Sequence, residues 1–186
     1  MRKVLVILVA LALLIGTQIV VANAAVDTRR QRFGGPGDDV ARGIFVDSNY
    51  IYIVGRTRST FSGTSDLFLW IFNRADNSFR CRVAVDIVDI GGTGADDYGQ
   101  AVVAYTSGSV THVYVIGHTY YGANPSNFLV VKFGTNCNVL GAAVYDIDGA
   151  DLPFGLTISP DGLYLYIARR LIPIHSWLFV KCSPPA

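Results

Sequence analysis

The stretch RFGGPGDDVARGIFVD, residues 32–47, joins a glycine-rich turn to a pair of aspartates and a short apolar run. A weaker copy, IGGTGADDYGQAVVAY, covers residues 90–105. Gly and Asp favour turns, whereas Val, Ile and Tyr favour strands. Because the same order of turn and strand signals recurs, we interpret the stretch as the start of a structural repeat and not as an isolated binding motif.

Three aspartates, Asp39, Asp97 and Asp151, align the copies of this repeat. The segments DVARGIFVD, DYGQAVVAY and DLPFGLTIS then correspond, and their fifth positions hold the small residues Gly43, Ala101 and Gly155. A second strand signal follows in IYIVGRT, VYVIGHT and LYIARR, and a third in DLFLWIF, NFLVVKF and SWLFVKC. A fourth, FRCRVAVDIVDI or VLGAAVYDI, follows in the first two copies. The pattern predicts three units of short antiparallel strands, of which the third is one strand short.

Four short antiparallel strands in a unit of about 55 residues are typical of a β-propeller blade. A single blade has two apolar faces, so neighbouring copies must cover them. We therefore expect an all-β, propeller-like domain with about three four-stranded blades, at residues 34–90, 91–147 and 148–182. A strand at residues 26–33 is expected to complete the last blade.

These residues resemble the secreted bacterial and archaeal β-propeller repeat proteins of the SBBP type, whose repeats are similar to F-GG-G-D-D-A-GIAVD-GN-YVTG-T followed by D-FVVKF. The first copy matches at Phe33, Gly34, Gly35, Gly37, Asp38, Asp39, Ala41, Gly43, Tyr52, Gly55 and Thr57. The second matches at Gly91, Gly92, Gly94, Asp96, Asp97, Tyr114, Gly117, Thr119, Lys132 and Phe133, and the third keeps Gly149, Asp151, Gly155, Tyr166 and Lys181. The resemblance implies a secreted propeller but no particular ligand.

Three blades are fewer than the four to eight that are usual in propellers. Three explanations stay open. The copies close into an unusually small ring, or the N-terminal strand pairs with the last blade of a neighbouring molecule to give a closed oligomer or a fibre. The third is that the chain is a truncated or divergent relative of a larger propeller.

Residues 1–24, MRKVLVILVALALLIGTQIVVANA, carry two positive charges, an apolar run, and Ala22 and Ala24 at the spacing that signal peptidase accepts. We predict a secretory signal that is cut after Ala24. The alternative is an uncleaved anchor, because residues 19–21 extend the apolar length. No other stretch is long and apolar enough to be transmembrane, so we expect no membrane span in residues 25–186 and a secreted or cell-surface location.

Charge argues against nucleic acid as a partner. The chain has 15 basic and 14 acidic residues, and removal of the leader takes away Arg2 and Lys3. The mature chain is therefore close to neutral, without the excess of positive charge that binds phosphate backbones. All of the acidic residues are Asp, and Lys is rare, which also favours turns and strands over helices.

The chain has three cysteines, Cys81, Cys137 and Cys182, which is an odd number for a protein in an oxidising compartment. Their spacing is not that of a zinc site, and we expect partly buried thiols with at most one disulfide, whose pairing the sequence leaves open.

The aspartates at the start of each copy are expected to accept backbone N–H bonds from the glycine-rich loops. The alternative is a calcium site that gathers carboxylate oxygens from Asp38, Asp39, Asp96, Asp97 and Asp151, with Asp148 as a further donor. No cofactor is predicted apart from this calcium alternative.

Residues with catalytic chemistry are scarce. The three histidines, His112, His118 and His175, are interpreted as loop or strand-edge side chains, and no catalytic residue is predicted. Tyr120 and Tyr121, in the loop segment GHTYYGANPSN, are the candidates for ligand binding, because tyrosine rings stack on sugars and contact protein partners. The alternative is that the two rings cap the core of the blade. The tryptophans Trp70 and Trp177 are expected in the core between blades.

The sequence therefore predicts a secreted, non-enzymatic protein that binds a protein or glycan partner at the cell surface, in adhesion or assembly. Two alternatives stay open. One is a structural subunit of an extracellular filament or ring that self-assembles by strand exchange, and the other is a propeller enzyme that acts on glycans.

Overall fold

The computed structural model describes residues 34, 37–58, 64–86, 96–120, 126–146, 150–172 and 176–185, with the side chains of residues 171–172 and 176–179 left aside. These residues all belong to one unit, Phe33–Ala186. The predicted leader, the predicted strand at residues 26–33, Tyr121, Asp148 and His175 lie outside the described residues. Within the described ranges, no helix is long and apolar enough to cross a membrane.

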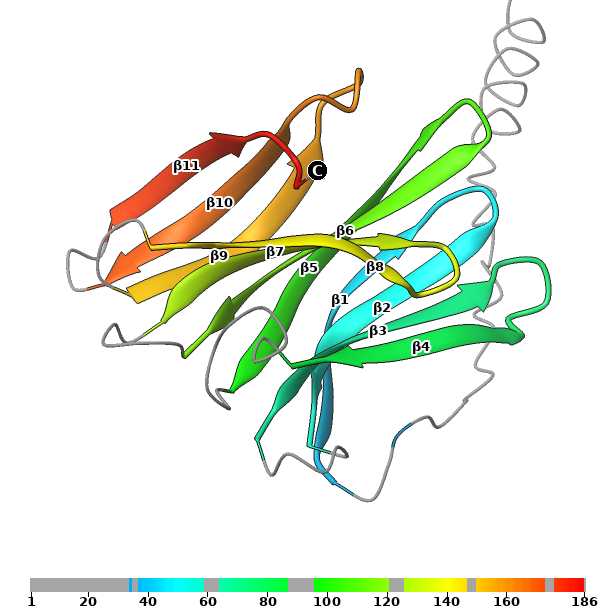
Figure 1. Ribbon diagram of the computed structural model, residues 1–186, viewed down its shortest axis with the longest axis horizontal. Coiled ribbons are helices and arrows are strands. Elements are labelled where there is room, and N and C mark those ends of the chain that lie inside the picture. Colours follow the sequence, from blue (N-terminus) through cyan, green and yellow to red (C-terminus); the bar gives the residue numbers. More distant parts are fainter. Residues whose placement is uncertain are drawn as a thin grey trace, which may run out of the picture. The chain divides into compact units, whose positions relative to one another are not determined.

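The described chain is all-β and forms three antiparallel sheets (Figure 1). The first sheet contains β1 (Asp39–Val46), β2 (Tyr50–Thr57), β3 (Asp66–Asn73) and β4 (Phe79–Val85). The second contains β5 (Asp97–Ser107), β6 (Val110–Thr119), β7 (Asn127–Gly134) and β8 (Val139–Tyr145), and the third β9 (Ala150–Ile158), β10 (Leu165–Ile172) and β11 (Ser176–Cys182). In each sheet the strands pair in chain order.

The three sheets confirm the predicted all-β class and the predicted repeat. Their strands fall on the strand signals of the three aligned copies, and the third sheet has three strands where the others have four. The sheets are separate, and the described strands form no closed ring. The strand expected at residues 26–33 cannot be placed in the third sheet, since it lies outside the described residues.

The strand register confirms the alignment of the copies. Gly43 pairs with Val54, Ala101 with Ile116, and Gly155 with Ala168. In each sheet the register of the first strand shifts just before this small residue, which marks a β-bulge. The bulge is therefore part of the repeat.

The hairpin turns use local polar contacts. Asp47 Oδ1 accepts the N–H groups of Asn49 and Tyr50, each at 2.7 Å, which closes the turn between β1 and β2. The hydroxyl of buried Tyr52 donates to Asp47 Oδ2 at 2.7 Å. Burial and this carboxylate raise the pKa of Tyr52 well above its usual range. Asn77 and Cys137, in the corresponding turns of the first and second sheets, both have positive φ, of 58° and 64°.

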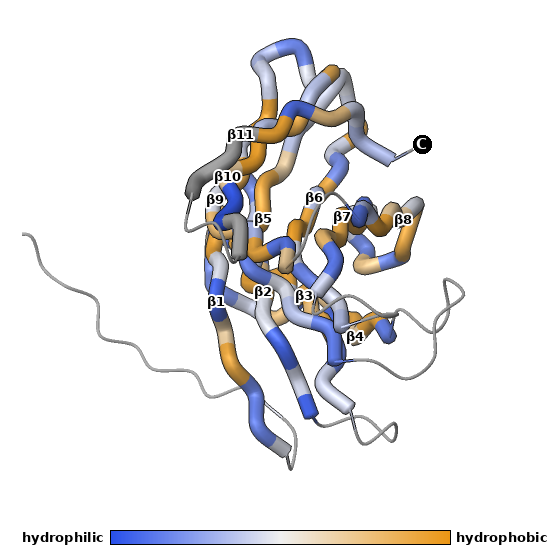
Figure 2. Tube along the Cα trace, turned by 90° about the vertical axis from the view of Figure 1, so that its left-hand side faces the viewer, coloured by the Kyte–Doolittle hydropathy of each residue, from blue (hydrophilic) through white to orange (hydrophobic). Residues whose placement is uncertain are grey.

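The hydrophobic core lies in two layers between consecutive sheets. Successive side chains of a strand point to opposite faces of the sheet, so alternate residues of β6 enter the two core layers. Val113 and Val115 pack with the first sheet, whereas Tyr114 and Ile116 pack with the third. The apolar residues follow the strands and the described turns are largely hydrophilic (Figure 2). The second sheet is therefore covered on both of its faces.

Backbone contacts repeat from one sheet to the next. The N–H of Asp97 donates to the carbonyl of Ser65 at 2.6 Å, and the N–H of Asp151 donates to the carbonyl of Ser126 at 3.1 Å. These serines hold the same place, just before the third strand of the preceding sheet. The first strand of a sheet is therefore held to its predecessor by the same hydrogen bond in both cases.

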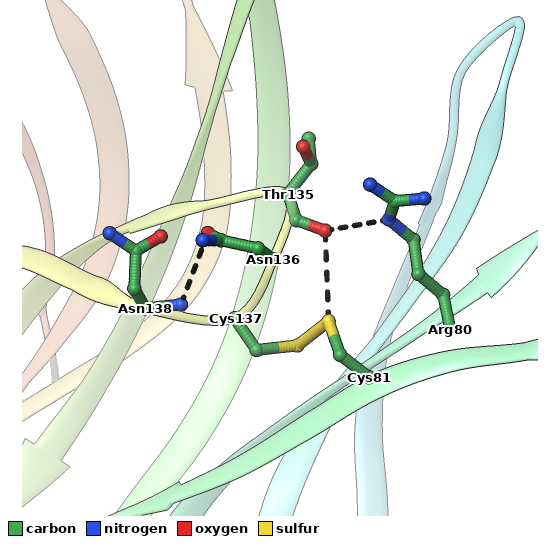
Figure 3. The surroundings of a disulfide bond; sticks show 6 residues. All are labelled: Arg80, Cys81, Thr135, Asn136, Cys137 and Asn138. Atoms are coloured by element: carbon green, nitrogen blue, oxygen red, sulfur yellow. Dashed lines mark hydrogen bonds between the residues drawn. A yellow bond between two sulfur atoms is a disulfide. The ribbon is translucent and has the colours of Figure 1, made fainter.

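One disulfide joins the first two sheets (Figure 3). Cys81 of β4 is bonded to Cys137 in the turn between β7 and β8, with a Cα–Cα distance of 6.0 Å. Beside it, Arg80 Nε donates to the carbonyl of Thr135 at 2.8 Å (Figure 3). Cys182 is a free, half-buried thiol against the second core layer. This pairing agrees with the expectation of at most one bridge.

The two tryptophans were expected in the core. Trp70 is only half-buried on β3, where its ring lies 4.7 Å from that of Phe68. The backbone of Trp177 lies in β11, and its side chain is outside the described part.

Candidate functional site

The β-bulges of the three sheets turn one side chain each toward a shared pocket. The bulge residues are Arg42 in β1, Gln100 in β5 and Phe154 in β9. A bulge redirects a side chain that regular alternation would point elsewhere. Arg42 and Gln100 meet across two sheets, where Arg42 Nη1 donates to Gln100 Oε1 at 3.3 Å. The first strands of all three sheets thus contribute to one site.

The site is an open pocket of about 370 Å³, called here the arginine–aromatic pocket. Among the described residues, its lining contains two guanidinium groups, three aromatic rings, an imidazole, an amide and one aliphatic side chain, and no acidic residue. The lining residues are Arg42, Arg56, Tyr98, Gln100, His118, Tyr120, Leu152 and Phe154. All of these come from described segments.

Tyr98 lies at the centre of the pocket. Its ring is stacked on the imidazole of His118, with 4.7 Å between centroids and an angle of 13° between the planes. The guanidinium carbons of Arg42 and Arg56 lie 5.6 Å and 5.4 Å from the centroid of the same ring. Both distances are within the range of cation–π attraction. The aromatic ring therefore holds two like charges close together.

His118 is the most deeply buried of the polar groups in the pocket, with 5% of its surface exposed. Burial, and secondarily the charge of Arg42, lower its pKa to about 4. The imidazole is therefore neutral at pH 7. Its Nδ1 has no hydrogen-bond partner within the described part of the chain. A buried polar atom without a partner is costly, and a ligand that reaches this nitrogen would relieve that cost.

Tyr120, one of the two tyrosines predicted to bind a ligand, lines the pocket and is 50% exposed. Its ring meets those of Tyr98 and His118 edge-on, at 5.8 Å and 5.6 Å. Its N–H donates to the carbonyl of Asp96 at 3.2 Å, which fixes the backbone at this point. The other candidate, Tyr121, lies outside the described residues.

The aspartates proposed as calcium ligands are dispersed and have separate roles. Asp38 is exposed, and its carbonyl accepts the N–H of Arg58 at 3.0 Å. Asp39 lies against Gly34. Asp97 and Asp151 are fully buried, and Asp151 pairs with the buried guanidinium of Arg169. In the described segments, no group of three or more His, Cys, Asp or Glu residues is placed to hold a metal ion.

Asp96 accepts a backbone N–H bond, but from the segment before β3 and not from the glycine-rich loop that precedes it in the sequence. Its Oδ1 accepts the N–H of Ser65, from the first sheet, at 2.7 Å. Its Oδ2 accepts the hydroxyl of Tyr98 at 3.3 Å. The hydrogen bond from Ser65 is the main reason that the pKa of Asp96 is lowered. This carboxylate therefore fixes both the contact between the two sheets and the central ring of the pocket.

Sequence reasoning did not identify most of the pocket. Arg42, Arg56 and Tyr98 were not considered, and His118 was wrongly assigned to a strand edge, whereas it is buried in β6. The missing signal was in the aligned copies. The fourth position of DVARG, DYGQA and DLPFG is the bulge residue in every sheet.

Comparison with known proteins gives no relative from which a role could be taken. No protein-family model matches the chain, and no curated protein matches it.

Proposed function

We propose that the protein is a non-enzymatic binding protein at or outside the cell surface, with the arginine–aromatic pocket as its binding site. The observation that carries this proposal is the placement of two guanidinium groups around the ring of Tyr98, in a pocket whose described lining residues include no acid. Arginine forms bidentate hydrogen bonds with carboxylates. The site is therefore suited to an anionic ligand.

The aromatic groups specify the rest of the ligand. Tyr120 and Phe154 are each 50% exposed at the pocket, and tyrosine rings stack on the apolar faces of sugars. A glycan that bears carboxylate groups, such as a polymer of uronic acids, combines a ring with a negative charge. We take this as the ligand class, in preference to a protein partner.

Two further features support this setting. The disulfide between Cys81 and Cys137 is typical of proteins in oxidising compartments. The three sheets repeat the same pairing order, the same bulge and the same contact with the preceding sheet. On these grounds, and by the resemblance to the SBBP type, we infer that the sheets are propeller-like blades and that their first strands surround the site.

The test is calorimetric titration with a uronic acid oligosaccharide, with an uncharged glucose oligosaccharide as the comparison. We expect binding of the acidic sugar alone, weakened at least about tenfold by Arg42→Ala or Arg56→Ala and by added salt, since charge-assisted hydrogen bonds are lost or screened. Arg82→Ala, at an exposed position of β4, is the matched control and should bind normally. Equal binding of the neutral sugar, or an equal effect of Arg82→Ala, would contradict the proposal.

A further inference from the structure

The first sheet carries an apolar face that is covered in the two other sheets. Ile44 and Val46 of β1 are 67% and 47% exposed. They pair across the strands with Ile53 and Ile51 of β2, so these four residues lie on one face, called here the β1 face. A contiguous exposed apolar face on a folded domain marks an interaction site.

The repeat shows what this face packs against elsewhere in the molecule. By register, the position of Ile44 is taken by Val102 in β5 and by Leu156 in β9. Val102 is buried in the core layer against the first sheet, and Leu156 packs in the layer against the second.

The β2 side of the face follows the same rule. Ile51 and Ile53 are half-buried, whereas their counterparts in β6 and β10 are completely buried. The counterparts are Val113, Val115, Leu165 and Ile167. The β1 face is thus the same surface that twice receives the preceding sheet within the chain.

The third sheet has the complementary surface. In the first sheet, Tyr52 and Val54 pack toward the next sheet. Their counterparts in β10 are Tyr166 and Ala168, which pair with Thr157 and Gly155 of β9. Ala168 and Thr157 are exposed. We call these four residues the β10 face.

We propose that the β1 face of one molecule docks on the β10 face of a second copy, by the packing that already joins the first sheet to the second and the second to the third. Such a head-to-tail contact forms a ring if its rotation closes. Propeller rings usually contain about four to eight sheets. Each chain supplies three sheets, so two copies, with six sheets in total, are the only number of copies that falls in this range. The inferred assembly is therefore a closed dimer.

The test uses the chain expressed from Met1 and purified without reductant, in sedimentation and light-scattering measurements over a wide range of concentration. We expect a particle with twice the mass of the chain. Ile44→Asp should weaken the dimer at least about tenfold, because a carboxylate would be buried among apolar groups. Ala168→Asp should do the same from the other face. Leu163→Asp, in the exposed turn before β10, is the matched control and should leave the dimer intact.

A mixing experiment tests the head-to-tail arrangement. Ile44→Asp chains and Ala168→Asp chains are each expected to be monomers, whereas an equimolar mixture should associate, since each chain supplies the face that the other has lost. Circular dichroism and thermal unfolding check that both variants fold, and Val46→Asp replaces Ile44→Asp if the latter does not.

Three results would overturn the proposal. The first is a monomeric wild-type protein, which would mean that another part of the chain covers the β1 face or that it stays open. The second is a dimer that Ile44→Asp and Ala168→Asp leave unchanged. The third is an Ile44-dependent assembly larger than a dimer, which would exclude the closed ring of two copies.

Discussion

At the scale of single residues, the pocket depends on a histidine whose charge is set by burial. His118 is stacked on Tyr98 and its lowered pKa keeps it neutral, while the guanidinium groups of Arg42 and Arg56 lie beside the same ring. A protonated imidazole at this place would add a third positive charge to the pocket. The lowered pKa of His118 therefore affects the charge of the pocket as well as the stability of the fold.

This burial predicts how stability depends on pH. The pKa of His118 is about 4 in the folded chain, against 6.5 for an unperturbed histidine. Between these values the unfolded chain binds a proton that the folded chain does not, so stability falls as the pH is lowered from 6.5 to 4. The difference amounts to about 3 kcal/mol, since one pKa unit corresponds to about 1.4 kcal/mol.

Urea unfolding at a series of pH values measures this loss. In His118→Gln, the part due to the imidazole should disappear, so that the curve of the free energy of unfolding against pH is flatter above pH 4 than in the wild type. His112→Gln, at a half-buried position of the same strand, is the comparison: burial also lowers the pKa of His112, but by less than that of His118, so this variant should flatten the curve less. A curve that keeps its slope in His118→Gln would show that other groups bind the protons.

At the scale of strands and sheets, the sequence predicted the strands but not the contacts between residues of different sheets. The strand signals of the aligned copies mark all of the described strands, including IYIVGRT for β2 and VYVIGHT for β6. Turn residues and the period of two are local properties, so one chain segment is enough to reveal them.

The site depends on contacts that segments make only after folding. A period of two cannot predict the bulge at Arg42, because a bulge breaks that period. Nor does spacing along the chain show that the ring of Tyr98 lies beside two arginines of the first sheet. The pairing of Cys81 with Cys137 was open for the same reason, whereas Tyr120 was found because it stands in a loop beside a strand end.

Close packing within the sheets predicts different outcomes for two glycine substitutions. A Cβ on Gly55 would collide with the carbonyl oxygen of Val40 and lie 2.9 Å from the ring of Phe68. The backbone of β1 would have to move, and we expect Gly55→Ala to lower the free energy of unfolding by about 2 kcal/mol or more.

Gly155→Ala is the matched control. Among the described residues, a Cβ there would meet only Ala168 Cβ, at an ordinary 3.5 Å, and the corresponding position of the second sheet is already Ala101. Denaturant unfolding of the two variants should therefore give a large loss for the first and a change within about 0.5 kcal/mol for the second. Equal losses would contradict the packing described for β1 and β2.

At the scale of the whole molecule, the three sheets are tied together unequally. Both junctions have a core layer and a backbone hydrogen bond, but only the junction between the first and second sheets has a described disulfide. The third sheet has instead a buried ion pair, Arg169 with Asp151, within its own strands. During unfolding, the junction between the first and second sheets should therefore open after the junction between the second and third.

Removal of the disulfide measures this difference. The Cys81→Ser, Cys137→Ser double variant should lose about 2 to 4 kcal/mol, because a closed loop of this length restricts the unfolded chain. Reductant should destabilise the wild type by a similar amount and leave the double variant unaffected. Cys182→Ala, which removes the free thiol, should keep the response to reductant. A wild type insensitive to reductant would contradict this assignment.

The same disulfide decides how the chain responds to a pulling force. The two cysteines are separated by 56 positions, and tension applied at the chain ends passes directly from Cys81 to Cys137 through the sulfur atoms. About 190 Å of extended backbone is thereby kept out of the load path, at about 3.4 Å per residue. Strands β5, β6 and β7 and part of β4 cannot be drawn out by such a force. The segments before Cys81 and after Cys137 are the only ones that can lengthen while the disulfide holds.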